Sequence, residues 1–217
     1  MRSRTPLQKW FYAMYLFTTT RNGVAAKELQ RQLGVTYKTA WRIGHELRKY
    51  MAWVDGDRPL GGGGSMVEID KAFIGGYDKR GEDDKTVVLG MAEHHGGEVV
   101  TRVIHDRSRF SVVPPVLQWV QRGLRIATDE AHVFKMLDDD YEHHSVNHHA
   151  KEWARGDVHT NTIEAFWGTV KRTIRGTHIR VSRKHLQKYL WEIEFCYNLR
   201  RQPHLMFEVL LQAFRRA

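Results

Sequence analysis

The sequence predicts an α/β domain preceded by a small all-α unit, and three observations support that prediction. Residues 6–51 carry apolar side chains at the 3- and 4-residue spacing of helices. Residues 66–129 contain short runs rich in Val, Ile and Thr, which are typical of strands. Between these parts, the run Leu60-Gly61-Gly62-Gly63-Gly64-Ser65 is too rich in glycine to hold a regular element. We therefore expect a helical domain at 1–58, a linker at 59–66 and an α/β domain at 67–217.

Residues 6–51 contain helix-starting and helix-ending residues in the order typical of a helix-turn-helix unit. An apolar stripe predicts a helix over residues 6–19, which Asn22-Gly23 ends. A second helix is expected over residues 25–33, followed by a short turn at Gly34-Val35. Thr36 then stands in the N-cap position of a third helix that reaches about Met51. Two helices joined by so short a turn are typical of helix-turn-helix DNA-binding domains.

The third helix carries the side chains that DNA recognition requires. Its polar residues Tyr37, Lys38, Arg42 and His45 fall on or near one side, opposite an apolar face. A recognition helix aims its N-terminal polar residues at base edges and its cations at phosphates. An ordinary three-helix packing unit with a solvated basic face is the alternative. The tight glycine turn and the surplus of Lys and Arg favour DNA binding.

The second part predicts three strands, a helix, a fourth strand and then helices. The strands are expected at residues 66–70, 86–91, 98–104 and 124–128, with Gly96-Gly97 as a hairpin signal. The helices are expected near residues 113–121, 161–175, 183–201 and 205–216. This order is an α/β pattern of the ribonuclease H-like kind, in which strand ends present carboxylates.

Composition narrows the class of protein. The single cysteine, Cys196, excludes a disulfide framework and a multi-cysteine zinc site. No apolar run approaches the roughly 20 residues that span a bilayer, and the N-terminal residues lack the apolar segment of a signal peptide. We therefore expect a soluble, cytoplasmic protein with no membrane contact.

The net charge of +9 is unevenly distributed along the chain. Residues 1–60 and 150–217 are strongly basic, whereas residues 61–149 hold 15 acidic residues against 10 Lys and Arg. Basic ends attract a polyanion such as DNA, and an acidic middle suits a carboxylate cluster that binds divalent cations. A solvated surface with chance asymmetry is the alternative interpretation.

Three acidic residues stand where metal-dependent chemistry would need them. Asp70 is placed at the end of the first strand, Asp129 at the end of the fourth, and Glu164 in the first turn of a helix. Carboxylates gathered from separate elements repel one another unless a cation lies between them, and Mg²⁺ is the usual partner. Two such ions about 3.5–4 Å apart could activate the attacking oxygen and stabilise the leaving one during displacement at phosphorus.

Each acid also has a structural explanation. Asp70 could start a turn, Asp129 could cap a following helix, and Glu164 could complete a capping box with Asn161. Glu130 is an alternative ligand that ranks below Asp129. A zinc site is also conceivable, but adjacent histidines on a strand point to opposite faces, so a polar loop is the favoured interpretation. The histidines concerned are His143, His144, His148 and His149.

Four stretches of the sequence resemble one family. They are Val67-Glu68-Ile69-Asp70 with Phe73-Ile74-Gly75-Gly76, Thr128-Asp129-Glu130, Val146-Asn147-His148, and the long segment from Gly156 to Leu190. These stretches look like the ISXO-type insertion-sequence transposases, which are DDE enzymes. The resemblance covers almost the whole chain, and the last segment is its most specific part.

The resemblance implies a ribonuclease H-like catalytic domain in which Asp70, Asp129 and Glu164 hold two Mg²⁺ or Mn²⁺ ions. It also implies that Lys171 and Arg172 bind transposon-end DNA. Asn161 would assist the metal site or simply cap its helix. The implied function is a transposase that binds terminal inverted repeats, cleaves a strand and joins its 3′-hydroxyl to target DNA. Since two ends must meet, we expect a homodimer or larger assembly on DNA.

Two departures from the family pattern and two alternative functions stay open. Relatives usually carry a cysteine zinc ribbon ahead of the helix-turn-helix unit, and this sequence contains none. Relatives often have an acidic residue where Lys71 stands, and we expect a modest effect because this side chain should point to the other face of the strand. The alternatives are a catalytically idle DNA-binding relative and a stand-alone metal-dependent nuclease.

Overall fold

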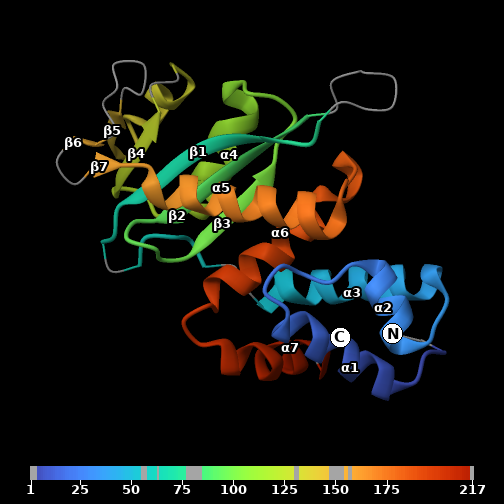
Figure 1. The fold of residues 1–217 in the computed structure, drawn as a ribbon. Helices are drawn as coiled ribbons and strands as arrows, with labels where there is room; N and C mark the ends of the chain where they lie inside the picture. The colour runs from blue at the N-terminus through green and yellow to red at the C-terminus, as the bar shows by residue number, and fades with distance from the viewer. Residues whose placement is uncertain are drawn as a thin grey trace. The chain divides into compact units, whose positions relative to one another are not determined.

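The computed structural model describes residues 4–54, 58–62, 64–76, 85–129, 132–146, 154–155 and 158–215. The chain forms two compact units, one from residues 1–56 with 172–217 and the other from residues 57–171. The helical unit and the sheet unit are both visible in Figure 1. This grouping differs from the predicted division at one point, because the last two helices belong to the same unit as the N-terminal helices.

The sheet unit is built on five strands in the order β3-β2-β1-β4-β5. β1 (Val67–Ile74), β2 (Thr86–Glu93) and β3 (Val99–Val103) form an antiparallel meander. β4 (Arg125–Asp129) then pairs parallel with β1, and β5 (Glu142–Val146) pairs parallel with β4. Three antiparallel strands extended by two parallel ones form a ribonuclease H-like sheet, so the predicted fold class is confirmed.

The two faces of β1 have different partners because successive side chains alternate between faces. Val67 and Ile69 join the apolar core that also contains residues of α4 (Arg109–Trp119). Glu68 and Asp70 face the other way and bond to α5 (Asn161–Thr173). Figure 1 shows α5 lying across the sheet. The acidic positions of β1 are therefore enclosed between a sheet and a helix.

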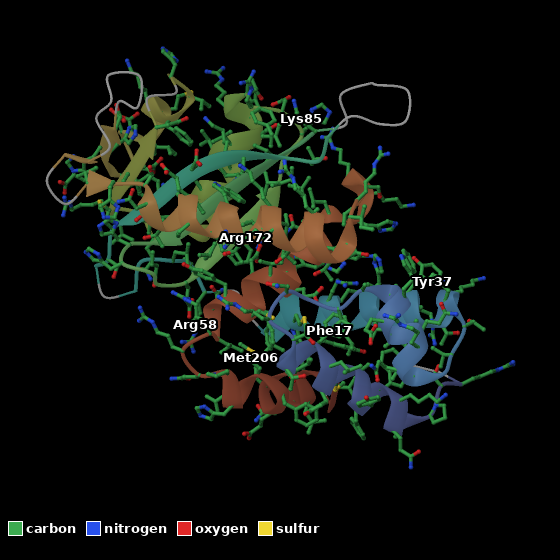
Figure 2. The ribbon with its side chains drawn as sticks, in the orientation of Figure 1. Phe17, Tyr37, Arg58, Lys85, Arg172 and Met206 are labelled. Carbon is green, nitrogen blue, oxygen red and sulfur yellow. The ribbon has the colours of Figure 1, made fainter. Side chains whose placement is uncertain are left out.

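The helical unit has one apolar core of its own. The helices that contribute to this core are α1 (Leu7–Thr19), α2 (Ala26–Leu33), α3 (Tyr37–Val54), α6 (Arg183–Asn198) and α7 (Met206–Arg215). Phe17 and Met206, both labelled in Figure 2, belong to this core. A buried ion pair between Arg48 of α3 and Glu192 of α6, at 2.7 Å, joins the two ends of the chain. Glu192 also accepts the Val24 amide, so the buried carboxylate is well provided with donors.

The turn between α2 and α3 is as short as the sequence predicts. Gly34 ends α2 in the left-handed region, with φ of 57° and ψ of 48°, where glycine is favoured. The Thr36 hydroxyl oxygen accepts the amide of Thr39 at 3.3 Å and so caps α3. His45 departs from prediction, because it is buried beside Trp41 and Tyr189 and does not share the exposed side of α3.

Several boundaries differ from those predicted. β1 continues to Ile74, so Asp70 lies inside the strand and does not end it. β5 was not predicted, because its sequence Glu-His-His-Ser-Val lacks an apolar period and the strand is defined by its pairing with β4. Shorter elements complete the fold, and none of the described helices is long and apolar enough to cross a membrane. They are β6 (Ala154–Arg155), β7 (Val158–His159), two 3₁₀ turns (His132–Leu137 and Pro203–Leu205) and a π-helical turn (Ile174–His178).

Candidate active site

Asp70 lies in the middle of β1, where α5 crosses the sheet. Its Oδ2 atom accepts a hydrogen bond from Trp167 Nε1 at 3.0 Å. This approach depends on Gly90, which pairs with Asp70 from β2. A Cβ atom at Gly90 would lie 2.4 Å from the Trp167 ring, closer than such atoms come in proteins. Glycine therefore makes room for the indole that holds the Asp70 carboxyl group.

Asp129 and Glu164 lie close enough to Asp70 to act on its charge. Ile69 pairs with Thr128 in the parallel ladder, so the next residues, Asp70 and Asp129, follow at the same level. Burial, together with the charges of Asp129 and Glu164, raises the pKa of Asp70 to about 6. The Lys71 backbone and Trp167 oppose this rise through hydrogen bonds to the carboxyl group. A carboxyl that titrates near neutrality indicates a cluster short of positive charge.

Lys71 points to the opposite face of β1 from Asp70, as predicted, yet its ammonium group also reaches Asp129. Its Nζ lies 3.7 Å from Asp129 Oδ1, and its side chain is only 8% exposed. The same ammonium group lies 4.1 Å from the centre of the Phe134 ring. Burial lowers the pKa of Lys71, whereas the neighbouring carboxylates of Asp129 and Asp70 act to raise it. The long lysine side chain reaches Asp129 at the end of β4 from that face, a contact that strand alternation alone does not predict.

The start of α5 does not match the capping-box explanation of Glu164. The helix begins at Asn161, and the amides of Thr162 and Ile163 donate to Glu68 Oε2 at 2.8 and 2.9 Å. Glu164 instead accepts the Thr160 hydroxyl at 2.7 Å. The free amides at this helix end are therefore satisfied by Glu68, a buried residue of β1. Glu164 is left with an exposed side chain beside the two aspartates.

The predicted DNA-binding residues are all on exposed helix surfaces. Lys171 and Arg172 are exposed near the C-terminal end of α5, and Figure 2 labels Arg172. Tyr37, Lys38 and Arg42 are exposed on α3, and Tyr37, also labelled in Figure 2, is 46% exposed. These positions can reach a large polyanion without any change of fold.

The remaining candidates divide between described and undescribed residues. Asn161 is exposed at the start of α5, and its amide donates to His159 Nδ1 at 3.3 Å. His143 contacts Asp138 and Thr128, and His144 contacts Glu142, so each ring has its own protein partners. The other candidates, Glu130, His148 and His149, lie outside the described residues.

The sequence did not lead us to predict a role for Glu68, Trp167 or Gly90 around the three acids. Glu68 sits two residues before Asp70, so the alternation of a strand could have placed both carboxylates on one face. Trp167 and Gly90 gave no such signal, because their roles depend on contacts between elements distant in the sequence.

The fold and the cluster together define a ribonuclease H-like domain with acids on two central strands and on the helix that covers them. A family model described as the ISXO2-like transposase domain matches residues 59–198. The chain therefore belongs to the ISXO2-like transposase family, as its sequence motifs had indicated. No curated protein sequence matches the chain.

Solved structures offer distant likenesses. The chain is similar to one described as the crystal structure of a pre-cleavage Mos1 transpososome, with a TM-score of 0.42 and 13% identity, covering 100% of this chain and 81% of that one. It is also similar to the crystal structure of the Mos1 Strand Transfer Complex, with a TM-score of 0.32 and 10% identity, covering 98% and 81%.

Proposed function

We propose that this protein is a DDE transposase that binds insertion-sequence ends and catalyses DNA strand cleavage and strand transfer. The observation that supports the proposal best is the half-buried Asp70 carboxyl beside Asp129 and Glu164, whose pKa is raised to about 6. Negative charges that repel one another in this way are typical of sites where a bound cation or a reaction requires them. Membership of a transposase family supplies the class of reaction.

The three carboxylates fit a divalent metal centre. Mg²⁺ and Mn²⁺ prefer oxygen ligands, and carboxylates crowded around a cation-poor space match that preference. We assign the metal ligands to Asp70, Asp129 and Glu164. Two bound ions would activate the attacking oxygen and stabilise the leaving oxygen of a phosphodiester.

The surrounding residues hold these ligands in place. Trp167 donates to Asp70 Oδ2 and the Thr160 hydroxyl donates to Glu164, so each carboxylate keeps one oxygen directed by the protein. Lys71 supplies positive charge beside Asp129. Asn161, one turn before Glu164, is a candidate supporting residue at the same helix start.

DNA binding is assigned to the two basic ends of the chain. Residues 1–58 would form the helix-turn-helix domain, with Tyr37, Lys38 and Arg42 facing DNA, and residues 59–66 the linker to the catalytic domain at 67–217. Lys171 and Arg172 would contact transposon ends. Because two ends must be brought together, we propose that the protein acts as a dimer or larger assembly on DNA in the cytoplasm.

The experiment that tests this function is a paired assay on end-bearing DNA. Asp129→Asn keeps the shape of the side chain but removes its charge, so Mg²⁺-dependent nicking and joining should fall by at least about 1000-fold. Gel-shift affinity for the same DNA should be unchanged. Glu142→Gln, an exposed residue of β5, is the matched control and should cut normally.

Three outcomes separate the alternatives. Cleavage without joining by the wild type would favour a stand-alone nuclease. DNA binding with neither activity would favour an idle relative. Wild-type cleavage by Asp129→Asn would remove this residue from the reaction.

A further inference from the structure

We propose that His94, His95 and His159 form a second metal site, suited to Zn²⁺ and distinct from the carboxylate cluster. One ligand atom from each of these residues can be chosen so that all three lie within 4.8 Å of one another. The ring centroids of His94 and His95 are 4.1 Å apart, as are those of His94 and His159. Imidazole nitrogens are preferred ligands of Zn²⁺ and poor ligands of Mg²⁺, so this donor set selects a different metal.

His94 has the features of a metal ligand. Its side chain is 6% exposed, and its Nδ1 lies 2.7 Å from Glu68 Oε1. Because Glu68 Oε1 is an acceptor, the proton belongs on Nδ1, and Nε2 then carries a lone pair. Among the described residues, this buried Nε2 atom has no hydrogen-bond partner. Burial also lowers the pKa of His94, which favours the neutral ring that a metal requires.

Glu68 is placed to orient a second ring. His159 Nδ1 lies 3.5 Å from the same Glu68 oxygen and accepts the Asn161 amide at 3.3 Å. Ligation through His159 Nε2 would move the ring proton to Nδ1, where Glu68 can accept it in place of the bond that Nδ1 now accepts from the Asn161 amide. A carboxylate behind metal-bound histidines is the usual way in which proteins fix the orientation of these rings.

His95 completes the set from the turn between β2 and β3. It is exposed and has a φ of 58°, in the left-handed region that non-glycine residues seldom adopt. Nitrogens around tetrahedral zinc are about 3.4 Å apart, given bonds of about 2.0–2.1 Å. The three nitrogens, now within 4.8 Å of one another, would draw together around a bound ion, and the exposed His95 ring has the most room to rotate. Water would fill the fourth position.

Zinc at this site would tie the β2–β3 turn to the residues that lead into α5. His159 precedes Asn161, the first residue of the helix that carries Glu164. The metal would therefore steady the start of that helix from outside the carboxylate cluster. This role concerns the stability of the fold and requires no catalytic activity.

The test is binding of Zn²⁺ to the metal-free full-length protein, measured by competition with a chromophoric chelator in excess Mg²⁺. We expect one tight site per chain and a rise in Tm of about 5 °C at saturation. Co²⁺ in place of Zn²⁺ should give the visible absorption bands of a four-coordinate ion. His95→Ala, which changes an exposed side chain, should weaken binding at least about 100-fold.

Two further variants separate this site from other sources of binding. Asp70→Asn/Asp129→Asn should keep the tight site, whereas His105→Ala, an exposed histidine of the same unit, should behave as the wild type. Loss of zinc binding in the double aspartate variant with full binding in His95→Ala would place the metal at the carboxylates and overturn the proposal. Absence of any site tighter than micromolar in the wild type would also overturn it.

Discussion

Glu68 and Asp70 are two residues apart on the same face of β1, yet their surroundings differ sharply. Glu68 is fully buried and receives two backbone amides of α5 together with His94. Asp70 receives a side-chain hydrogen bond from Trp167 and is crowded by the charges of Asp129 and Glu164. A buried carboxylate that is fully paired holds the fold together, whereas one placed beside like charges is suited to binding something else.

The first prediction concerns Glu164, one of the two carboxylates whose charge acts on Asp70. Glu164→Gln should reduce Mg²⁺-dependent cleavage at least about 1000-fold, equivalent to about 4 kcal/mol of activation free energy. Its Tm should change little, because glutamine can still accept the Thr160 hydroxyl. The measurement is single-turnover cleavage alongside thermal unfolding. A variant that cuts at nearly the wild-type rate would return Glu164 to a structural role.

The second prediction concerns Glu68, whose carboxylate is paired with two backbone amides and His94. Glu68→Ala leaves two α5 amides and His94 without their acceptor, so the free energy of unfolding should fall by about 3 kcal/mol. Urea denaturation of the metal-free protein measures this loss. Glu98→Ala, at an exposed position before β3, is the control and should lose less than about 0.5 kcal/mol. A loss below about 1 kcal/mol for Glu68→Ala would show that its pairing is not structural.

The third prediction contrasts these buried charges with exposed ones. Lys38→Ala/Arg42→Ala should weaken binding to end-bearing DNA roughly tenfold and lower the magnitude of the salt slope by about 2, because two phosphate contacts are lost. Cleavage chemistry on bound DNA should be preserved. The measurement is affinity across a salt series, with Arg31→Ala on α2 as control. An unchanged slope would remove α3 from the DNA-binding surface.

The smallest effect is expected at His45, a buried polar residue for which we propose no binding role. Both ring nitrogens of His45 lack partners among the described residues, and its ring packs against Trp41. His45→Phe should therefore change the free energy of unfolding at pH 7 by less than about 1 kcal/mol. A larger destabilisation would show that the imidazole contributes more than packing.

The pH dependence of the same variant gives a second measurement. Burial lowers the pKa of His45 to about 3, below its ordinary value of 6.5. As pH falls below 6.5 the unfolded chain takes up the proton first, so stability declines toward pH 3 by up to about 1.4 kcal/mol per pH unit. His45→Phe should lose less stability than the wild type between pH 7 and pH 5. Equal losses would contradict the neutral buried imidazole.

The sequence predicted the architecture better than the contacts within it. The central strands, α5 and the turn at Gly34 follow from apolar periodicity and helix-ending residues, which are local signals. The polar strand β5 and the contact of Lys71 with Asp129 escaped prediction, because both depend on the packing of residues distant in the sequence. The grouping of α6 and α7 with the N-terminal helices is likewise a property of tertiary packing.

The site was predictable only in part for the same reason. Asp70, Asp129 and Glu164 could be proposed from their positions after strands and at a helix start. The residues that set their environment could not, since Glu68 of β1, Gly90 of β2 and Trp167 of α5 act through contacts between the sheet and that helix. Motifs therefore predict the three acids, while contacts between elements show which residues surround them.

The most direct test of the difference between the two carboxylates is the thermal unfolding of metal-free protein with and without Mg²⁺. Mg²⁺ should raise the wild-type Tm by about 3 °C and that of Asp70→Asn by much less, because a ligand that binds only the folded state stabilises it. Without metal, Asp70→Asn should melt at or above the wild type, since one repelling charge is gone. Glu68→Gln should melt lower than the wild type but keep its response to Mg²⁺. An Asp70→Asn protein that responds to Mg²⁺ as the wild type does would contradict the account.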